Sequence, residues 1–555
     1  RLRGLSMHDA VLEVNHWCHE QVTYAPSDAR TRSPLATIRN ARGRCGEESV
    51  FTTAALRAAG IPARQVYCPR WAHSDDNHAW VEAWVDSAWF YLGACEPDVD
   101  LNRAWFTEPA RRAMLVTAPV QGRYRGTEDV LGGTELYTRI STLPVYAETQ
   151  VINIRVTDSN RVPTAGALVD FRVFNYGEFH PIAVLPSDAE GRVSFRTGYG
   201  DLLVWARDGD DHAYQLVKAG NVHTVRLALR GVSPDARNVI IEYEPPRAES
   251  LNIPPHPRRE EIDRRLRAGD SLRSDYEAGF IDSTRAAAFA LRIGCDAGAT
   301  WEILRGSRGN WRAIQTFFEE GSRLDAPQAL HFLQALRVKD LQDARPDALL
   351  DHFRVGLQHL RMTHGVRGRI DEITTHEVLN PRIGREELRP WRALLQEAAD
   401  AITGEIPDAV ALVRWVRDSI RPVEEENWSR VPLSPDLTYA LRTADAASRD
   451  IFFVGLCRAA GIPARIDPAT GRPQYREKEA WIDADLDGNA GRAVEHAELL
   501  LRLPAARSIL SPAYARHYTL GRFENGSYHT LDFEGDPRVS SWPMTLKLEP
   551  GRYQL

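Results

Sequence analysis

The sequence contains few cysteines, few lysines and no long apolar run. Its six cysteines are scattered over 555 residues without a Cys-x-x-Cys pair, which argues against a disulfide-stapled scaffold and against paired-cysteine zinc sites. No apolar stretch reaches the roughly 20 residues that a membrane-spanning helix needs. Lysine occurs four times among 69 basic residues, which we attribute to genome composition and not to function.

Charge and composition exclude little else. The net charge of −7 gives no electrostatic reason to expect nucleic acid as a partner. The hydrophobic fraction of 43% and the charged fraction of 26% are ordinary for globular proteins, and the length predicts three to five domains. The chain opens with Arg1-Leu2-Arg3, which is neither a start methionine nor a signal-peptide pattern, so the sequence leaves the compartment open.

The stretch 42–97 carries the clearest chemical signal. Gly43 and Gly46 bracket Cys45 and are expected to let the backbone turn tightly there. Apolar residues then recur at helical spacing until Gly60 and Pro62, which are typical of a helix end. Cys45 is therefore expected at a helix N-terminus, where the helix dipole stabilises a thiolate.

A histidine follows on a predicted strand. Residues 78–85 alternate between two faces, and a turn at Asp86 leads into a second strand, Trp89–Ala94. Cys45 and His78 are thus predicted to form the nucleophile and base of cysteine acyl transfer. The Cys45 backbone N–H is the first candidate oxyanion donor, and Gln21 and Trp17 remain alternatives for the second.

Three motifs in this stretch resemble the transglutaminase-like superfamily of papain-type folds. They are Gly43-Arg44-Cys45-Gly46-Glu47, Ala59-Gly60-Ile61-Pro62-Ala63-Arg64 and His78-Ala79-Trp80-Val81-Glu82. The resemblance places the family's nucleophile at Cys45 and its base at His78. It implies acyl transfer through a thioester, without a cofactor.

The third catalytic residue departs from this resemblance. The family usually has an acidic residue four positions after the tryptophan of the second strand, where this sequence has Gly93. The nearest acid is Glu96, which we expect to orient His78 from a shifted strand end. Asp98 is an alternative, and so is a Cys–His dyad with no acid.

A metal site is the rival interpretation of the same region. The candidate ligands are His73, Asp75, Asp76 and His78, with Cys68 and Cys95 nearby. Their spacing fits no standard zinc motif, so we predict no metal. Peptide N-glycanases of the superfamily typically carry two Cys-x-x-Cys zinc pairs before the nucleophile, and their absence argues against that activity.

The rest of the chain predicts a multidomain α+β protein. Short alternating strands predict a β-sandwich that resembles Ig-like modules, Pro-rich and charged residues predict a linker at Tyr243–Asp270, and helical stripes predict a spacer. The predicted domains are a transglutaminase-like catalytic domain (1–125), the Ig-like β-sandwich (148–232), the helical domain (271–385), a degenerate transglutaminase-like domain (386–500) and a small, truncated β-module (501–555).

An internal repeat supports the fourth of these domains. The octapeptide Arg57–Arg64 recurs unchanged 401 residues later, from Arg458 to Arg465. The same offset carries Cys45 to Ala446, His78 to Glu479 and Trp80 to Trp481. We therefore predict that the fold is repeated while the nucleophile and the base are lost.

The sequence thus predicts a bacterial cysteine hydrolase or acyltransferase. Its predicted substrate is a protein, peptide or glycopeptide, attacked at a peptide or carboxamide bond. The alternative is a non-catalytic binding or scaffold protein built from transglutaminase-like and β-sandwich modules.

Overall fold

The computed structural model describes residues 1–220, 224–231, 238–248, 256–364, 372–404, 406–424, 427, 429–488, 497–503, 511–534 and 536–555. These residues form two compact units. The first comprises Arg1–His19, Glu48–Leu266 and Arg492–Leu555, and the second comprises Glu20–Glu47 and Arg267–Gly491. No helix among the described residues has the length and apolar character of a membrane span.

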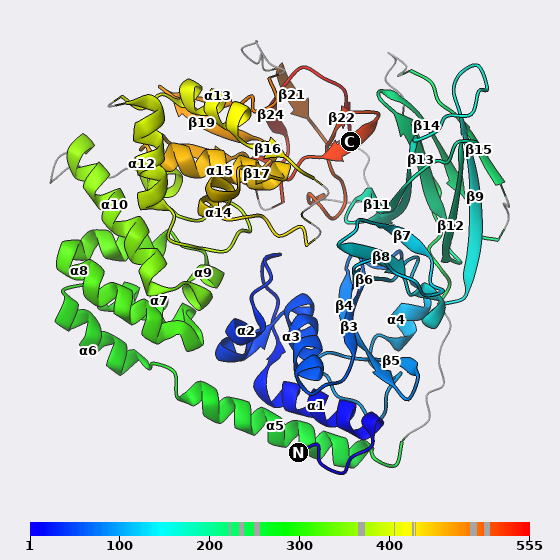
Figure 1. Ribbon diagram of the computed structural model, residues 1–555, viewed down its shortest axis with the longest axis horizontal. Helices are drawn as coiled ribbons and strands as arrows, with labels where there is room; N and C mark the ends of the chain where they lie inside the picture. The colour runs from blue at the N-terminus through cyan, green and yellow to red at the C-terminus, as the bar shows by residue number, and fades with distance from the viewer. Residues whose placement is uncertain are drawn as a thin grey trace. The chain divides into compact units, whose positions relative to one another are not determined.

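The N-terminal part of the chain combines helices with an antiparallel sheet (Figure 1). The sheet has six antiparallel strands in the order β5-β4-β3-β6-β8-β7. In chain order the elements are α1 (Met7–Gln21), β1 (Thr23–Tyr24), α2 (Pro34–Asn40), β2 (Arg42–Gly43), α3 (Cys45–Ala58), β3 (Ala63–Cys68), β4 (His78–Val85), β5 (Ala88–Leu92), α4 (Thr107–Arg111), β6 (Thr117–Gln121), β7 (Val130–Gly133) and β8 (Tyr137–Ser141).

The predicted helix and strands of the catalytic stretch are present. Cys45 is the first residue of α3, and His78 is the first residue of β4. The expected reason for the tight turn was wrong, because neither Gly43 nor Gly46 has a positive φ. The left-handed residue before α3 is Ala41, with φ 57°, which ends α2.

Seven strands build the predicted β-sandwich. One sheet has the order β11-β10-β13-β14 and the other β12-β9-β15, and both sheets contribute to one apolar core (Figure 1). The strands are β9 (Thr149–Thr157), β10 (Leu168–Asn175), β11 (Glu178–Pro186), β12 (Arg192–Gly198), β13 (Leu202–Asp208), β14 (Asp211–Val217) and β15 (Thr224–Ala228). Its Ig-like assignment stays a prediction.

The predicted linker is partly helical, which corrects the interpretation of Tyr243–Asp270. Helix α5 (Arg259–Ala278) begins inside it. Its first turns contain the ion pair Arg259–Asp263 at 2.7 Å and bury Ile262. Charged residues spaced four apart support a helix as well as they suit a solvated linker, so composition alone misled.

Further helices pack on a core of their own, as the stripes predicted. The long helices α8 and α10 lie against each other (Figure 1). The elements are α6 (Ser283–Ile293), α7 (Ala297–Gly306), η2 (Arg308–Asn310), α8 (Trp311–Gln334), α9 (Val338–Asp343), α10 (Pro346–His364), α11 (Glu372–Thr374) and η3 (Thr375–Leu379).

The region of the predicted repeat has the element order of the N-terminal part. Helix α15 begins 401 residues after α3, and β18 begins 401 residues after β3 (Ala464 against Ala63). The elements are α12 (Arg392–Thr403), α13 (Ala409–Ser419), β16 (Arg421–Pro422), α14 (Pro435–Leu441), β17 (Thr443–Ala444), α15 (Ala446–Ala459), β18 (Ala464–Ile466), β19 (Pro473–Glu477) and β20 (Ala480–Asp483).

Local geometry repeats at the same offset. Ser33 and Ser434 precede α2 and α14 with ψ of 155° in both, and Ala41 and Arg442 end these helices with φ of 57° and 58°. Short parallel pairs, β1 with β2 and β16 with β17, follow the same pattern. The two segments thus share backbone geometry at the helix ends and the strand pairing, although the Ser33 side chain accepts from Ala36 N and the Ser434 side chain makes no such cap hydrogen bond.

The offset changes beyond β18. Trp84 N donates to Pro62 O at 2.8 Å, and Arg476 N donates to Pro463 O at 2.8 Å. Trp84 follows Pro62 by 22 residues, whereas Arg476 follows Pro463 by 13, so the second hairpin is nine residues shorter.

This register corrects the predicted correspondence of Trp481. Trp481 pairs with Arg476 across β19 and β20, as Trp89 pairs with Trp84 across β4 and β5. Trp481 therefore matches Trp89 and not Trp80. The same register moves the residue that matches His78 from Glu479 to Thr470, which lies in the turn before β19.

The C-terminal strands form two small sheets, β21-β24 and β23-β22-β25. Strand β21 lies within the range predicted for the repeat but pairs with β24 of this module. The module also contacts the sandwich, because Trp205 Nε1 donates to Gly526 O at 2.8 Å. The elements are β21 (Ala497–Leu501), β22 (Gly521–Glu524), β23 (Ser527–Thr530), η4 (Pro537–Val539), β24 (Met544–Leu548) and β25 (Tyr553–Gln554).

Candidate active site

Helix α3 begins with a reciprocal cap next to Cys45. Arg44 N donates to Glu47 Oε2 at 3.0 Å, and Glu47 N donates to Arg44 O at 2.8 Å. Cys45 is partly exposed at the first helical position. Its thiol therefore lies where the helix dipole favours a negative charge.

The carboxylate of Glu47 is buried in a basic enclosure. Arg32 Nε donates to Glu47 Oε1 at 3.0 Å, and Lys339 Nζ lies 3.2 Å from the same oxygen. Burial opposes ionisation, but the hydrogen bonds and charges of Arg32 and Lys339 outweigh it and lower the pKa of Glu47 to about 2. A permanent carboxylate thus fixes the first turn of α3.

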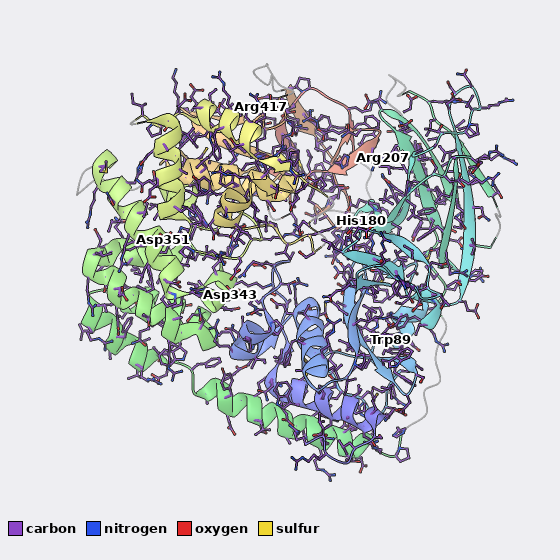
Figure 2. All side chains as sticks on the ribbon, viewed as in Figure 1. Trp89, His180, Arg207, Asp343, Asp351 and Arg417 are labelled. Atoms are coloured by element: carbon purple, nitrogen blue, oxygen red, sulfur yellow. The ribbon has the colours of Figure 1, made fainter. Side chains whose placement is uncertain are left out.

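The helical domain takes part in this bracing. Lys339 belongs to α9, and so does Asp343, labelled in Figure 2, which accepts from Arg30 Nη1 at 2.6 Å. Asn40 Nδ2 donates to Gln342 O of α9 at 2.9 Å. A helical segment expected to be a spacer therefore supports the chain that leads into Cys45.

His78 lies among aromatic rings. Its side chain is 8% exposed, and its ring centroid lies 4.8 Å from those of Trp105 and Phe106 and 5.6 Å from that of Trp80. Burial lowers the pKa of His78 to about 4. Within the described residues, its buried Nε2 has no hydrogen-bond partner.

Glu96 reaches His78 indirectly. Trp105 Nε1 donates to Glu96 Oε2 at 2.8 Å, and the Trp105 ring contacts the His78 ring. No hydrogen bond joins Glu96 to His78 in the part of the chain that the structure describes. Burial raises the pKa of Glu96, and the Trp105 hydrogen bond partly offsets this.

The Glu96 carboxylate occupies the space in front of Gly93. A Cβ atom built on Gly93 would lie 3.1 Å from Glu96 Oε2 and 3.1 Å from Glu96 Cβ. Gly93 and Glu96 also form an isolated antiparallel bridge. Glu96 therefore brings a carboxyl group to the place from which a side chain at position 93 would project.

Asp98, the alternative acid, is engaged elsewhere. Its Oδ1 lies 3.5 Å from Arg259 Nη1 and 3.6 Å from Arg103 Nε. These two guanidinium groups account for its charge, and neither contact involves His78.

Trp105 is the site residue that sequence reasoning missed. It is 60% exposed although its ring lies against a buried histidine, which is unusual for a large apolar side chain. It lies beyond the three family motifs, and only the short aromatic pair Trp105-Phe106 after the second strand could have drawn attention to it.

A buried polar chain supports β4 from behind. Trp80 Nε1 donates to Tyr146 Oη at 2.9 Å, and Tyr146 donates to Glu82 Oε1 at 2.5 Å. Arg64 Nε donates to Glu82 Oε2 at 2.6 Å. Arg64 and Glu82, the charged residues at the ends of the second and third motifs, thus bind each other inside the fold, and Tyr146 lies beyond the domain end predicted at residue 125.

The residues of the rival metal site have other contacts. Asp75 Oδ1 accepts from Tyr176 N at 2.7 Å, Cys68 Sγ donates to Arg70 O at 3.5 Å, and Cys95 Sγ lies 3.6 Å from Thr52 Oγ1. Burial raises the pKa of both thiols. Across the described ranges, no three His, Cys, Asp or Glu side chains gather as a metal site.

The second oxyanion donor stays a prediction. The Trp17 ring packs on Phe51 of α3, with centroids 5.7 Å apart. Gln21 is the last residue of α1.

Comparison with known proteins supports the family assignment. Residues 3–94 match the family model of the transglutaminase-like superfamily, which supports a transglutaminase-like domain in this segment. The match contains Cys45, His78 and Gly93, and ends two residues before Glu96.

A solved structure also matches part of the chain. It comes from Cytophaga hutchinsonii, is described as a putative cysteine protease, and is 27% identical over 16% of this chain and 31% of its own length, with a TM-score of 0.14. The match thus spans about a third of that protein. No curated protein matches the chain.

Proposed function

We propose that the protein is a cysteine-dependent acyl-transfer enzyme that acts on peptide or carboxamide bonds, with Cys45 as nucleophile and His78 as base. The observation that carries the proposal is the buried, unpartnered Nε2 of His78 within the described residues. Leaving such a group unpaired costs about 1–3 kcal/mol, and a catalytic role is one explanation for a group held at that cost. The family match of residues 3–94 supports the same roles.

The proposed reaction begins with proton transfer. His78 takes the proton of the Cys45 thiol as the sulfur attacks the carbonyl carbon of the substrate. The Cys45 backbone N–H, at the start of α3, donates to the oxyanion. The protonated His78 then gives its proton to the departing amine or ammonia, and a thioester remains on Cys45.

The second half of the reaction releases the acyl group. His78 takes a proton from water, the resulting hydroxide oxygen bonds to the thioester carbon, and the thiolate leaves and is reprotonated. An amine acceptor in place of water would give a new amide, as in a transglutaminase. We favour a protein, peptide or glycopeptide substrate, because the chain surrounds the catalytic segment with several further modules.

Glu96 is proposed to orient His78 through Trp105. The carboxylate holds the indole N–H, and the indole ring fixes one side of the imidazole. An arrangement without direct contact leaves the imidazole uncharged at rest, in agreement with its pKa of about 4. The resting pair is therefore proposed to be a neutral thiol and a neutral imidazole, with the ion pair formed only during attack.

The region 386–488 is proposed to be a transglutaminase-like copy without chemistry. Ala446 stands where Cys45 stands, and Thr470 where His78 stands. The backbone N–H of Ala446 corresponds to that of Cys45, the proposed oxyanion donor. It donates to Glu424 Oε1 at 2.6 Å, so a carboxylate of the chain itself already accepts from this N–H. A negative charge there opposes a second oxyanion.

The test is alkylation of Cys45 by iodoacetamide, followed by mass spectrometry, together with peptide and amide turnover. Wild type is expected to turn over a peptide or amide, and Cys45→Ala and His78→Ala are expected to lose about 10³-fold or more of that rate. The acid limb of kcat/KM is expected near pH 4 and not near 6.5, because neutral His78 must accept the proton.

The matched control is Cys68→Ala, which removes a thiol held by Arg70 O. Absence of peptide and amide turnover in wild type would leave the non-catalytic binding protein as the better account. Alkylation of Cys45 only above about pH 8 would not decide the matter, because a neutral resting thiol gives the same profile.

A further inference from the structure

The segment between β3 and β4 determines where His78 begins its strand. Residues 69–77 form a compact loop in which Trp71 N donates to Asp76 O at 3.0 Å and Asp76 N donates to Ser74 O at 2.8 Å. The loop then enters β4, where His78 pairs with Cys68 of β3. Any shift of this loop therefore moves the imidazole.

The β10–β11 hairpin of the sandwich holds this loop from outside. Asn175, the last residue of β10, is 1% exposed, and its Nδ2 donates to Ser74 O at 2.7 Å and Trp71 O at 2.8 Å, with Asp76 O at 3.4 Å. One side chain thus donates to Trp71 O and adds a second donor to Ser74 O and Asp76 O, which already accept hydrogen bonds within the loop.

The turn of the hairpin adds two further contacts, and the core of the sandwich adds a third. Tyr176 N donates to Asp75 Oδ1 at 2.7 Å, and the Arg70 guanidinium lies 5.1 Å from the centroid of the Tyr176 ring. Ala72 of the loop belongs to the apolar core of the sandwich. The loop and the hairpin are therefore joined by hydrogen bonds, a cation–π contact and shared core packing.

The hairpin accepts backbone strain at this contact. Tyr176 and Gly177 form a two-residue turn, with φ of 53° and 74°. The left-handed region suits Gly or Asn, and a tyrosine there is uncommon. Strained residues of this kind occur mostly at functional sites, where the surrounding structure holds them in place. Here Tyr176 is the strained residue, and it contacts the loop 69–77 twice.

The shorter repeat lacks the corresponding loop. Its hairpin is nine residues shorter, and β18 passes to β19 through a tight turn at residues 467–472. The region without a histidine at this position thus has no loop to hold. The long loop, the base and the hairpin occur together.

We propose that the β10–β11 hairpin clamps the loop 69–77 and that Asn175 is a positioning residue for the reaction assigned to Cys45 and His78; this rests on the proposed function. The sandwich is then part of the catalytic apparatus and not only a binding or spacing module. Its contribution is geometric, because a displacement of about 1 Å in a reacting group can cost about 10²-fold in rate.

The experiment compares Asn175→Asp and Asn175→Ala with wild type in the full chain. Asn175→Asp keeps the side-chain shape but removes the N–H donor. In both variants the amides of Trp71 and Asp76 are expected to exchange with deuterium about 10-fold faster, because the loop loses its outside donor. The kcat is expected to fall about 10–100-fold with KM changed less than about twofold.

Asn160→Ala is the matched control, since Asn160 lies exposed in a turn of the same sandwich. It is expected to change neither exchange nor kcat. If Asn175→Ala fails to fold, Tyr176→Gly keeps the turn while removing the ring over Arg70, and a smaller change in the same direction is expected.

The two readouts separate the two proposals. Faster exchange confined to residues 69–78 supports the clamp even if wild type shows no turnover, in which case the proposed function falls and the positioning role falls with it. Unchanged exchange in both Asn175 variants overturns the clamp. Faster exchange with an unchanged kcat overturns the role of Asn175 in catalysis.

Discussion

At the scale of single residues, the site depends on where one carboxyl group lies. The sequence placed Cys45 and His78 on a helix start and a strand start, and both placements are confirmed because local periodicity determines them. Glu96 was expected to orient His78, and the structure places Trp105 in contact with both. Contacts of this kind arise from tertiary packing, which a pattern along the chain does not contain.

The position of the acid can be tested by moving it. Glu96→Ala is expected to lower kcat/KM about 10–100-fold, because the Trp105 ring loses its anchor beside His78. Trp105→Phe is expected to cost a similar factor, and Glu96→Ala/Trp105→Phe no more than either alone, because the two residues act as one unit. Steady-state kinetics on the peptide substrate measures all three variants.

The converse variant restores the acid at the family's usual position. Gly93→Asp alone is expected to impair the enzyme, because its Cβ would lie 3.1 Å from Glu96 Oε2 and two carboxylates would compete for one space. Gly93→Asp/Glu96→Ala is expected to recover at least about 10-fold of the loss. Full activity in Glu96→Ala would contradict any role for this carboxyl group.

At the scale of elements, the first turn of α3 is stabilised by a charge network that the sequence did not reveal. The first family motif contains Glu47, but the partners of Glu47 lie outside that motif. Arg32 lies 15 residues before Glu47, and Lys339 lies far along the chain on α9. The prediction of a linker at Tyr243–Asp270 was wrong where α5 begins. The charged composition there suggested a linker, although the charged residues have helical spacing.

This network predicts how stability depends on pH. The pKa of Glu47 is lowered to about 2 in the folded protein, so its contribution is present above its ordinary value of 4.5 and is lost as the pH falls towards 2. The shift corresponds to ~3 kcal/mol at most. Urea unfolding between pH 2.5 and 6 is expected to show this loss in wild type, and Glu47→Gln is expected to be less stable at pH 6 with a flatter profile.

A surface pair provides the control. Glu302→Gln removes an exposed carboxylate on α7 that pairs with Arg305, and it is expected to leave the pH profile as in wild type. Parallel profiles for wild type and Glu47→Gln would show that the carboxylate of Glu47 adds nothing to stability.

At the scale of the whole molecule, the sequence predicted the order of the modules better than the residue correspondences and contacts between distant segments. The octapeptide predicted a repeat, but a fixed offset placed Trp481 and Glu479 wrongly, because the hairpin of β18 and β19 is nine residues shorter than that of β3 and β4. Neither Asn175 nor Tyr146 stood out in the sequence, since each contacts residues more than 60 positions away.

The second region is predicted to be inert even with its thiol restored. In a Cys45→Ala background, Ala446→Cys is expected to give a thiol that iodoacetamide alkylates only above about pH 8, with no turnover, because Glu424 holds the backbone amide and Thr470 stands where His78 would stand. Adding Glu424→Ala is expected to speed alkylation but not to give turnover. Mass spectrometry of both variants at pH 6 and 8.5 measures this, and rapid alkylation of Ala446→Cys at pH 6 would contradict it.

The short hairpin of β18 and β19 also limits what substitutions could change in this region. One substitution could place a thiol at residue 446 or an imidazole at residue 470, but it could not supply the nine residues by which this hairpin is shorter. Thr470→His would place an imidazole in a tight turn, not at the head of a strand. Substitutions alone would therefore not rebuild the geometry that the first region gives to His78.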